Sequence, residues 1–197
     1  MVERILTAAT SLFLEQGFGR TTLDQVAARA KTGKSSLYGH FRDKETLFSA
    51  VVHHSIELMF AEMTEPPTEG TIEDKLRDVG RALTESFLLP RCAALMRITA
   101  AEAETMPDLA HSAYQVSFDG SLQRVKAVLD ANTSMSDQET VTIATRFIEI
   151  ALQPLSFQAA FGGDLPALLA RSHEDVEDAI LLLKSKGYPL VPNLCDF

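Results

Sequence analysis

The chain has 197 residues, of which 46% are hydrophobic and 23% are charged, a balance that fits a soluble globular protein and excludes intrinsic disorder. No apolar run approaches the roughly 18 residues that a membrane span needs, so we expect a cytoplasmic protein with no membrane partner. The two cysteines, Cys92 and Cys195, are far apart and lack metal-ligand spacing, which excludes a disulfide framework and a cysteine-ligated zinc site.

The net charge of −9 is distributed unevenly along the chain. Residues 1–48 contain seven Lys and Arg against five Asp and Glu, a net charge of +2, and the remainder contains 11 against 22. This asymmetry favours a small neutral-to-basic module attached to an acidic body. Nucleic acid therefore stays open as a partner of the N-terminal module, although the whole chain is acidic.

Apolar residues recur near a period of 3.6 along almost the whole chain, which predicts an all-α fold of about nine helices. The first helix has this spacing from its start, unlike a signal peptide, and is expected to end at Gly17. Thr22 is placed to cap a short second helix. The first four helices are expected over residues 5–16, 23–30, 35–41 and 44–63.

A proline pair with flanking charges at residues 65–70 marks the clearest linker in the chain. After a further break at 132–134, Ser136 and Glu139 have the spacing of a capping box, and Ser172 is expected to begin the last helix. The remaining helices are expected over residues 72–89, 92–105, 107–129 with Gly120 as a point of kinking or division, 137–161 and 172–187.

The helix expected over 137–161 is apolar on two faces. A helix at the surface of a single domain has one apolar face, so this pattern leaves two interpretations. The helix lies in the centre of a core, or it packs against its own chain with one face and against a second copy with the other.

Residues 22–41 have the helix–short turn–helix pattern that places a second helix in the DNA major groove. The apolar residues of this stretch and its flanks can form a compact three-helix core; they are Phe13, Phe18, Leu23, Val26, Leu37, Phe41 and Phe48. The outward positions of the second helix carry polar or basic groups without a carboxylate, which suits contacts to phosphates and base edges. These residues are Lys34, Ser35, Ser36, Tyr38 and His40. Three small helices used only for packing are the alternative.

Residues 4–52 resemble the DNA-binding region of the TetR/AcrR family of transcriptional regulators, most strongly in the L-Y-x-H-F-x-x-K-E-x-L-F run at 37–48. The resemblance implies that Thr22 caps the second helix and touches the DNA backbone. It also implies that Lys44, at the start of the fourth helix, holds a phosphate with help from the helix dipole. The residues it assigns to the major groove are Lys34, Ser35, Ser36 and Tyr38, with His40 at its edge.

The turn between the two helices departs from the Ala-Gly-Val-Ser that is usual in the family, because residues 30–33 read Ala-Lys-Thr-Gly. A non-glycine residue in a left-handed turn costs about 1–2 kcal/mol, so Lys31 implies modest strain or an altered turn. Gly33 serves as an N-cap, though less well than serine. We interpret these departures as tuning of DNA binding and not as its loss.

Residues 72–188 match the family only loosely, as expected of its variable effector domain, although the segment 102–109 with Tyr114 is similar to the C-terminal domain of one TetR subgroup. The resemblance implies that the last two helices pair with those of a second copy in a four-helix bundle. The residues expected at this interface are Ile148, Leu155, Val176, Ile180 and Leu183. An effector pocket with an apolar lining would favour an aromatic or lipophilic ligand. Its expected lining residues, each of which could also be ordinary core, are Phe87, Met96, Tyr114, Phe118, Phe147 and Phe157.

Side chains that could bind metal or react are scattered along the sequence. His53 and His54 are adjacent on a helix and point about 100° apart, so they are poorly placed to share a metal ion. The chain has no phosphate-binding glycine loop, nucleophile elbow or metalloprotease motif. We therefore expect no catalytic residue, no metal and no cofactor.

The sequence thus predicts a homodimeric regulator with a helix-turn-helix DNA-binding domain over 1–47, a larger helical effector-binding and dimerisation domain over 48–188 and an extended tail over 189–197. Its expected partners are a near-palindromic double-stranded operator, a second copy and a small ligand that relieves repression. The fourth helix is expected to belong to both domains and to transmit a tilt to the recognition helix. A helical ligand-binding or protein-interaction module with a lapsed DNA face is the alternative, against which the acid-free face over 34–40 argues.

Overall fold

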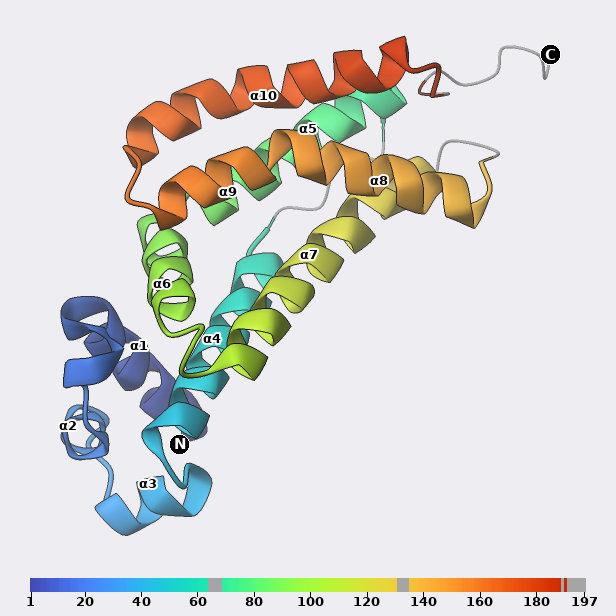
Figure 1. The fold of residues 1–197 in the computed structure, drawn as a ribbon. Helices are drawn as coiled ribbons and strands as arrows, with labels where there is room; N and C mark the ends of the chain where they lie inside the picture. Colours follow the sequence, from blue (N-terminus) through green and yellow to red (C-terminus); the bar gives the residue numbers. More distant parts are fainter. Residues whose placement is uncertain (64–68, 131–134, 189, 191–197) are drawn as a thin grey trace. The chain divides into compact units, whose positions relative to one another are not determined.

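The computed structural model describes residues 1–63, 69–130, 135–188 and 190, and all its regular elements in these ranges are α-helices (Figure 1). The all-α prediction is confirmed, with ten helices in the described ranges where about nine were expected. These are α1 (Val2–Arg20), α2 (Leu23–Arg29), α3 (Lys34–His40), α4 (Lys44–Ala61), α5 (Ile72–Phe87), α6 (Pro90–Ala101), α7 (Pro107–Asp130), α8 (Asp137–Ala151), α9 (Gln153–Ala160) and α10 (Leu165–Ser185). None of these helices is long and apolar enough to cross a membrane.

Several predicted breaks fall on parts of the chain that the structure does not describe. The break at 132–134 lies wholly outside the described residues, and the linker over 65–70 and the tail over 189–197 lie mostly outside them. Gly120, in contrast, lies within α7, which is one continuous helix. The helix is therefore not divided at Gly120, as one of the two predicted alternatives required.

The chain forms two compact units whose limits differ from the predicted domain boundary after residue 47. The first unit comprises residues 1–61 and 94–116, and the second comprises residues 62–93 and 117–197. Helix α4 therefore lies wholly in the first unit and is not shared, whereas α6 and α7 each continue from one unit into the other. The division of DNA binding and effector binding at residue 47 stays a prediction.

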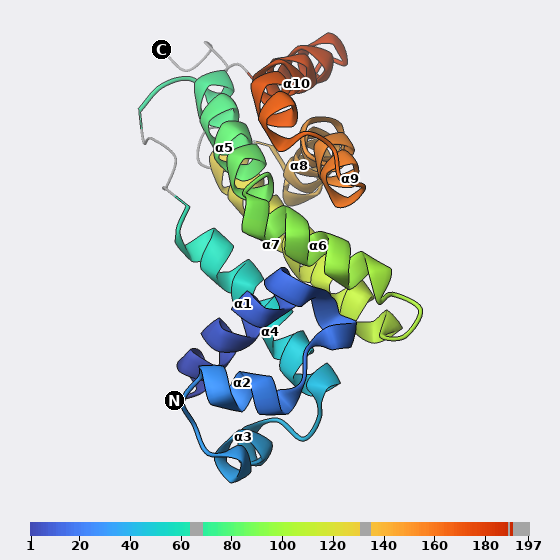
Figure 2. The ribbon, with the colours of Figure 1, turned by 90° about the vertical axis from the view of Figure 1, so that its left-hand side faces the viewer.

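An aromatic cluster forms the centre of the first unit, where α1 packs against α4. Figure 2 shows the ribbons of these two helices. The ring centroid of Phe13 lies 4.9 Å from that of Phe48 in an edge-on arrangement and 5.9 Å from that of Phe18. Val26 of α2 and Leu37 of α3 are completely buried against this core. The predicted three-helix core is thus confirmed, with Leu23 only partly buried. Helices α6 and α7 add residues that the pattern of the first 50 residues does not reveal: Leu95, Leu109 and Ala113.

Helix α1 changes direction at Gly17, where φ is 79° and ψ is 171°. Only glycine adopts this combination without strain, because a Cβ would collide with the backbone. The chain makes one more turn after the predicted helix end and reaches Arg20. The Thr21 hydroxyl donates to the Gly17 carbonyl at 2.8 Å, which closes the end of the helix.

In the second unit, α10 packs along α5 on one side and along α8 and α9 on the other (Figure 1). Helices α5, α8 and α10 meet at Gly80, where a Cβ would lie 2.8 Å from Phe147 Cζ and 3.0 Å from Val176 Cγ1. Both of these side chains are completely buried. Glycine is therefore required at residue 80 for the three helices to approach this closely.

The helix expected over 137–161 is divided between α8 and α9. Pro154 has no N–H to donate to the carbonyl four residues earlier, which accounts for the interruption at Leu152. At the other end, the predicted capping box is confirmed. The Ser136 N–H donates to Glu139 Oε2 at 2.8 Å, and the Glu139 N–H donates to Ser136 Oγ at 3.4 Å.

The last helix begins at Leu165, seven residues earlier than expected. Asp164 occupies the N-cap position and Pro166 lies in the first turn, where its missing N–H has no cost. Ser172 is buried inside the helix, and its hydroxyl donates to the Leu169 carbonyl at 2.8 Å. The prediction was wrong because a serine makes local backbone hydrogen bonds both at a cap and inside a helix.

Candidate nucleic-acid interface

Helix α3 presents a polar face to solvent. Leu37 on its inner side is completely buried and fixes the helix to the core of the first unit. Four of the five side chains predicted to face DNA are exposed: Lys34, Ser35, Tyr38 and His40. The fifth, Ser36, is half-buried, and its hydroxyl donates to Met1 Sδ at 3.2 Å. The helix thus offers hydrogen-bonding and basic groups to a partner.

Thr22 caps α2 as predicted. Its Oγ1 accepts the Gln25 N–H at 3.3 Å, and its own N–H donates to Gln25 Oε1 at 2.9 Å. This reciprocal capping box fixes the start of α2, because it satisfies two backbone donors that the helix leaves unpaired. The contact of Thr22 with the DNA backbone stays a prediction.

Lys44 contacts groups of its own chain, and its contact with a phosphate stays a prediction. Its Nζ donates to the carbonyls of Phe18 at 2.9 Å and Gly19 at 3.3 Å, and lies 4.3 Å from the centroid of the Phe18 ring. The side chain therefore joins the start of α4 to the end of α1. Its ammonium is partly buried at these groups.

The turn between α2 and α3 has the left-handed residue that the sequence predicts. Lys31 has a φ of 49°. The turn is nevertheless closed by backbone hydrogen bonds, from the Lys31 N–H to the Ala28 carbonyl at 3.2 Å and from the Thr32 N–H to the Ala27 carbonyl at 3.0 Å. The strain is thus confined to one exposed residue.

Three cations of this N-terminal module form ion pairs with carboxylates. The pairs are Arg29–Glu15 at 2.6 Å, Lys34–Asp24 at 2.6 Å and Arg42–Asp43 at 2.7 Å. The hydrogen bond from Arg29 lowers the pKa of Glu15, and the hydrogen bond to Asp24 raises the pKa of Lys34. Much of the basic character of the module is therefore neutralised within it.

Sequence reasoning assigned no role to Asp24 or Arg42. The sequence feature that could have indicated the Asp24–Lys34 pair is the position of Asp24 in the first turn of α2, ten residues before the lysine that begins α3. That spacing produces a contact only because the turn folds the two helices together. Arg42 follows α3 directly, and its side chain is 87% exposed, which makes it a further cation beside the recognition helix.

Two family profiles match the chain. The profile of "Bacterial regulatory proteins, tetR family" matches residues 5–51, and that of "AefR-like transcriptional repressor, C-terminal domain" matches residues 74–183, more than half of the chain. The chain belongs to the TetR family. This family consists of bacterial regulatory proteins, a non-enzymatic class.

Curated relatives match part of this TetR-family protein. The HTH-type transcriptional repressor Rv3405c of Mycobacterium tuberculosis is 36% identical over 85 residues, which are 43% of this chain and 45% of the relative. The HTH-type transcriptional repressor BepR of Brucella suis is 38% identical over 50 residues, 25% of this chain and 24% of the relative. The matched regions thus span less than half the length of these relatives.

Solved structures of TetR-family proteins share the fold over nearly the whole chain. A TetR-family regulator from Mesorhizobium loti has a TM-score of 0.76 at 23% identity, covering 92% of this chain and 95% of that one. The Flavonoid-responsive Regulator FrrA has a TM-score of 0.69 at 25% identity, covering 93% of this chain and 95% of its own.

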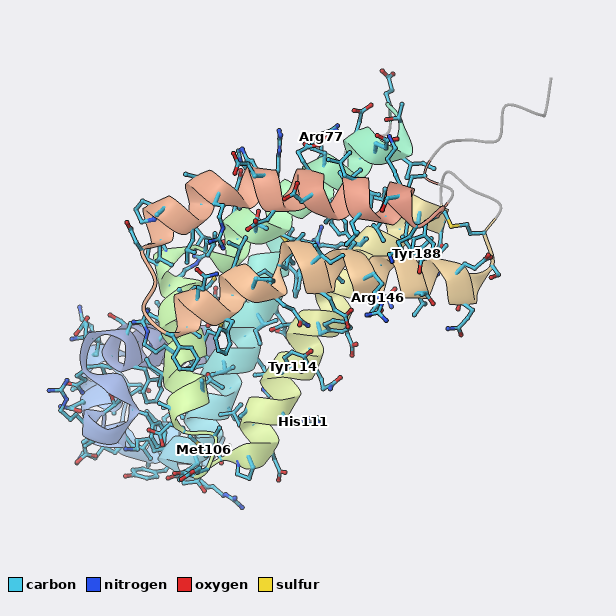
Figure 3. The ribbon with its side chains drawn as sticks, turned by 45° about the horizontal axis from the view of Figure 1, so that its top comes forward. Arg77, Met106, His111, Tyr114, Arg146 and Tyr188 are labelled. Carbon is cyan, nitrogen blue, oxygen red and sulfur yellow. The ribbon has the colours of Figure 1, made fainter. Side chains whose placement is uncertain are left out.

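The residues predicted to line the effector pocket of this TetR-family regulator are divided between the two units. Met96 and Tyr114 belong to the first unit, and Phe87, Phe118, Phe147 and Phe157 belong to the second. Phe147 is completely buried beside Gly80 and has a packing role. Phe157 and Tyr114 are more than half exposed, and Tyr114 is labelled on α7 in Figure 3. The pocket stays a prediction.

A surface cleft of about 310 Å³ lies between α5 and α10 in the second unit. Its lining is charged and consists of Arg81, His173, Glu174, Glu177 and Asp178. None of the six residues predicted for the effector pocket is among them. Beside this cleft Arg77, labelled in Figure 3, donates to Glu177 with Nε at 2.5 Å and Nη2 at 3.1 Å.

The five residues predicted at the dimer interface are core residues of a single chain. Each is at most 2% exposed: Ile148, Leu155, Val176, Ile180 and Leu183. Helix α8 packs against both α5 and α10 within the chain. Within 137–161, Ile148 and Leu155 thus fit the interpretation as a core segment, whereas Phe157 and Phe161 are exposed. The dimer interface stays a prediction. The apolar side chains that α9, α10 and their connection expose are Phe157, Phe161, Leu169, Leu181 and Leu182.

The histidines and cysteines considered as metal ligands have other surroundings. His53 Nδ1 lies 3.0 Å from the Ser49 carbonyl and its Nε2 lies 2.7 Å from Ser112 Oγ, so the ring links α4 to α7. Burial raises the pKa of the Cys92 thiol, and Cys195 lies outside the described residues. Over the ranges that the structure describes, no three His, Cys, Asp or Glu side chains are grouped to hold a metal ion.

Proposed function

We propose that this protein is a homodimeric repressor that leaves its operator when a small aromatic or lipophilic ligand binds to its C-terminal region. The observation that supports the DNA-binding half of this proposal is the exposed, polar face of α3 on a rigid apolar core. The names of curated relatives, which include repressors, support the direction of regulation.

The surface of α9 and α10 supports the homodimer. Phe157 and Phe161 are 65% and 79% exposed, with ring centroids 4.7 Å apart, and Leu181 is 60% exposed. Large exposed apolar groups that lie together, as Phe157 and Phe161 do, are typical of interfaces. A second copy related by a two-fold axis would present two recognition helices about 34–36 Å apart, one turn of B-DNA, to a near-palindromic operator.

Sedimentation at micromolar concentration tests the dimer. We expect the wild type to sediment as a dimer and Phe161→Glu to sediment as a folded monomer. Leu58→Glu is the control, because Leu58 is an exposed apolar residue on α4, away from α9 and α10 in the sequence, and this variant should stay dimeric. A wild type that sediments as a monomer would contradict the proposal. Substitutions at Ile148 or Leu183 do not test it, because these buried residues support the fold.

Relief by a ligand is supported by the fold likeness to a regulator described as flavonoid-responsive. Helices α6 and α7 offer the physical connection, because each continues from the second unit into the first, which contains α3. A ligand that prefers one arrangement of these helices would shift the population toward it and change the separation of the recognition helices.

The test begins with selection of bound DNA from a random pool by the wild type. The selected duplex is then titrated with protein in the presence of flavonoids and other aromatic compounds. We expect at least one to release the DNA, and reciprocity requires the duplex to weaken binding of that compound by the same factor. A compound that binds equally well with and without the duplex would disprove the coupling.

A further inference from the structure

Asp24 and Lys34 form an ion pair between the two helices of the helix-turn-helix. Lys34 Nζ donates to Asp24 Oδ2 at 2.6 Å, and the two side chains are 64% and 56% exposed. Lys34 is the first residue of α3, and Asp24 lies in the first turn of α2. The pair thus lies at the end of the recognition helix where DNA contacts are expected.

Stability of the fold does not explain this pair. Exposed ion pairs contribute little to stability, because water screens both charges and the side chains lose freedom. A lysine at the N-terminus of a helix is also on the unfavourable side of the helix dipole. A carboxylate on a surface that meets phosphates opposes binding as well. The pair therefore needs an explanation in terms of DNA recognition.

We propose that Asp24 is a specificity-determining residue that withholds the Lys34 charge from phosphates and directs its ammonium toward base edges. Affinity for DNA of any sequence comes mainly from cations that neutralise phosphates and release counterions. Lys34 paired with Asp24 adds no net charge to that process. The ammonium has three N–H donors, of which Asp24 uses one. The other two can bind the O6 and N7 acceptors of a guanine in the major groove.

This arrangement raises the ratio of specific to non-specific binding. On unrelated DNA the pair adds no affinity. On the correct sequence Lys34 donates hydrogen bonds to a base from the position in which Asp24 holds it. The inference rests on the DNA binding of the family and does not depend on the proposed dimer or ligand. Glu15–Arg29 offers a matched pair, because it has the same 2.6 Å separation and a carboxylate of similar exposure but joins α1 to α2.

The experiment compares the wild type, Asp24→Asn and Glu15→Gln by fluorescence anisotropy on two duplexes, one selected by the wild type and one of scrambled sequence. We expect Asp24→Asn to bind the scrambled duplex about tenfold more tightly at low salt, with a log-affinity against log-salt slope steeper by about 1, because one more cation meets a phosphate. Its gain on the selected duplex should be less than twofold. Glu15→Gln changes the net charge equally and should alter both affinities by less than twofold.

A second substitution tests whether Asp24 acts through Lys34. In a Lys34→Gln background, Asp24→Asn should no longer change the salt slope. Lys34→Gln alone should weaken binding to the selected duplex more than binding to the scrambled duplex. Both duplexes lose affinity to the unpaired Asp24 carboxylate, and only the selected duplex also loses a base contact. The inference is wrong if Asp24→Asn leaves the slope unchanged, tightens both duplexes equally, or has the same effect without Lys34. It is also wrong if Glu15→Gln acts as strongly. Circular dichroism on each variant verifies that the helices are retained.

Discussion

The ammonium of Lys44 lies 4.3 Å from the centroid of the Phe18 ring and donates a hydrogen bond to the Phe18 carbonyl at 2.9 Å. Phe18 itself packs against Phe13 and Phe48 in the core of the first unit. The lysine therefore links the start of α4 to the end of α1. Lys44, for which the family resemblance implies a phosphate contact, thus also joins the two helices that flank the helix-turn-helix.

Replacing Lys44 by methionine should destabilise the first unit by about 1–3 kcal/mol, because it removes a cation–π contact and charged hydrogen bonds. Chemical denaturation measures this loss. Lys31→Met is the control, since Lys31 is exposed, and we expect a change within about 0.5 kcal/mol. If Lys44 instead serves only a phosphate, the stability stays constant and the salt slope of DNA binding falls by about 1.

Gly17→Ala should destabilise the protein by about 1–3 kcal/mol, because alanine is strained at a φ of 79° and a ψ of 171°. It should also weaken DNA binding, since the kink sets the path from α1 to α2. Gly19→Ala is a close control in the same helix, where a Cβ meets no atom within 4 Å and φ is not positive. Equal melting temperatures for the two variants would refute the role given to the kink.

Gly80→Ala should destabilise the second unit by about 1–2 kcal/mol. The better helix propensity of alanine, worth about 1 kcal/mol, is outweighed by overpacking against Phe147 and Val176. Phe147→Leu removes the ring atom nearest to the new methyl group. The double variant should therefore be less destabilised than the sum of the two single variants, as a denaturation-based double-mutant cycle can measure. Strict additivity would speak against the close approach.

Glu177 should make stability depend on pH in the acid range. Hydrogen bonds from Arg77 lower the pKa of its carboxyl in the folded state. Its contribution is thus fully present above the unfolded pKa of about 4.3 and is lost as the pH falls toward the lower folded pKa. Glu177→Gln should be less stable than the wild type at pH 7, and the difference should shrink below about pH 4.

Urea denaturation at pH 7 and at acid pH checks this dependence. Glu174→Gln, on the same helix and lining the same cleft, is the control and should follow the wild type closely at both pH values. A stability gap for Glu177→Gln that stays constant with pH would overturn the explanation.

Local sequence patterns determined the helical fold, the helix-turn-helix and the polar face of α3. The reason is physical: a cap such as Thr22–Gln25 or Ser136–Glu139 is complete within four residues, and the side of a helix that Leu37 faces follows from helical periodicity. The left-handed Lys31 could also be predicted, because its place in a short turn fixes its backbone conformation. Such features need no knowledge of distant residues.

The tertiary structure alone decided which partners these residues have. Lys44 meets Phe18 across 26 residues and Arg77 meets Glu177 across 100, contacts that depend on how whole helices pack. Packing within the chain also buries the five residues expected at a dimer interface, of which only Ile148 lies on α8. Periodicity reveals that a face is apolar, but it contains no information on whether the chain itself or a second copy covers that face.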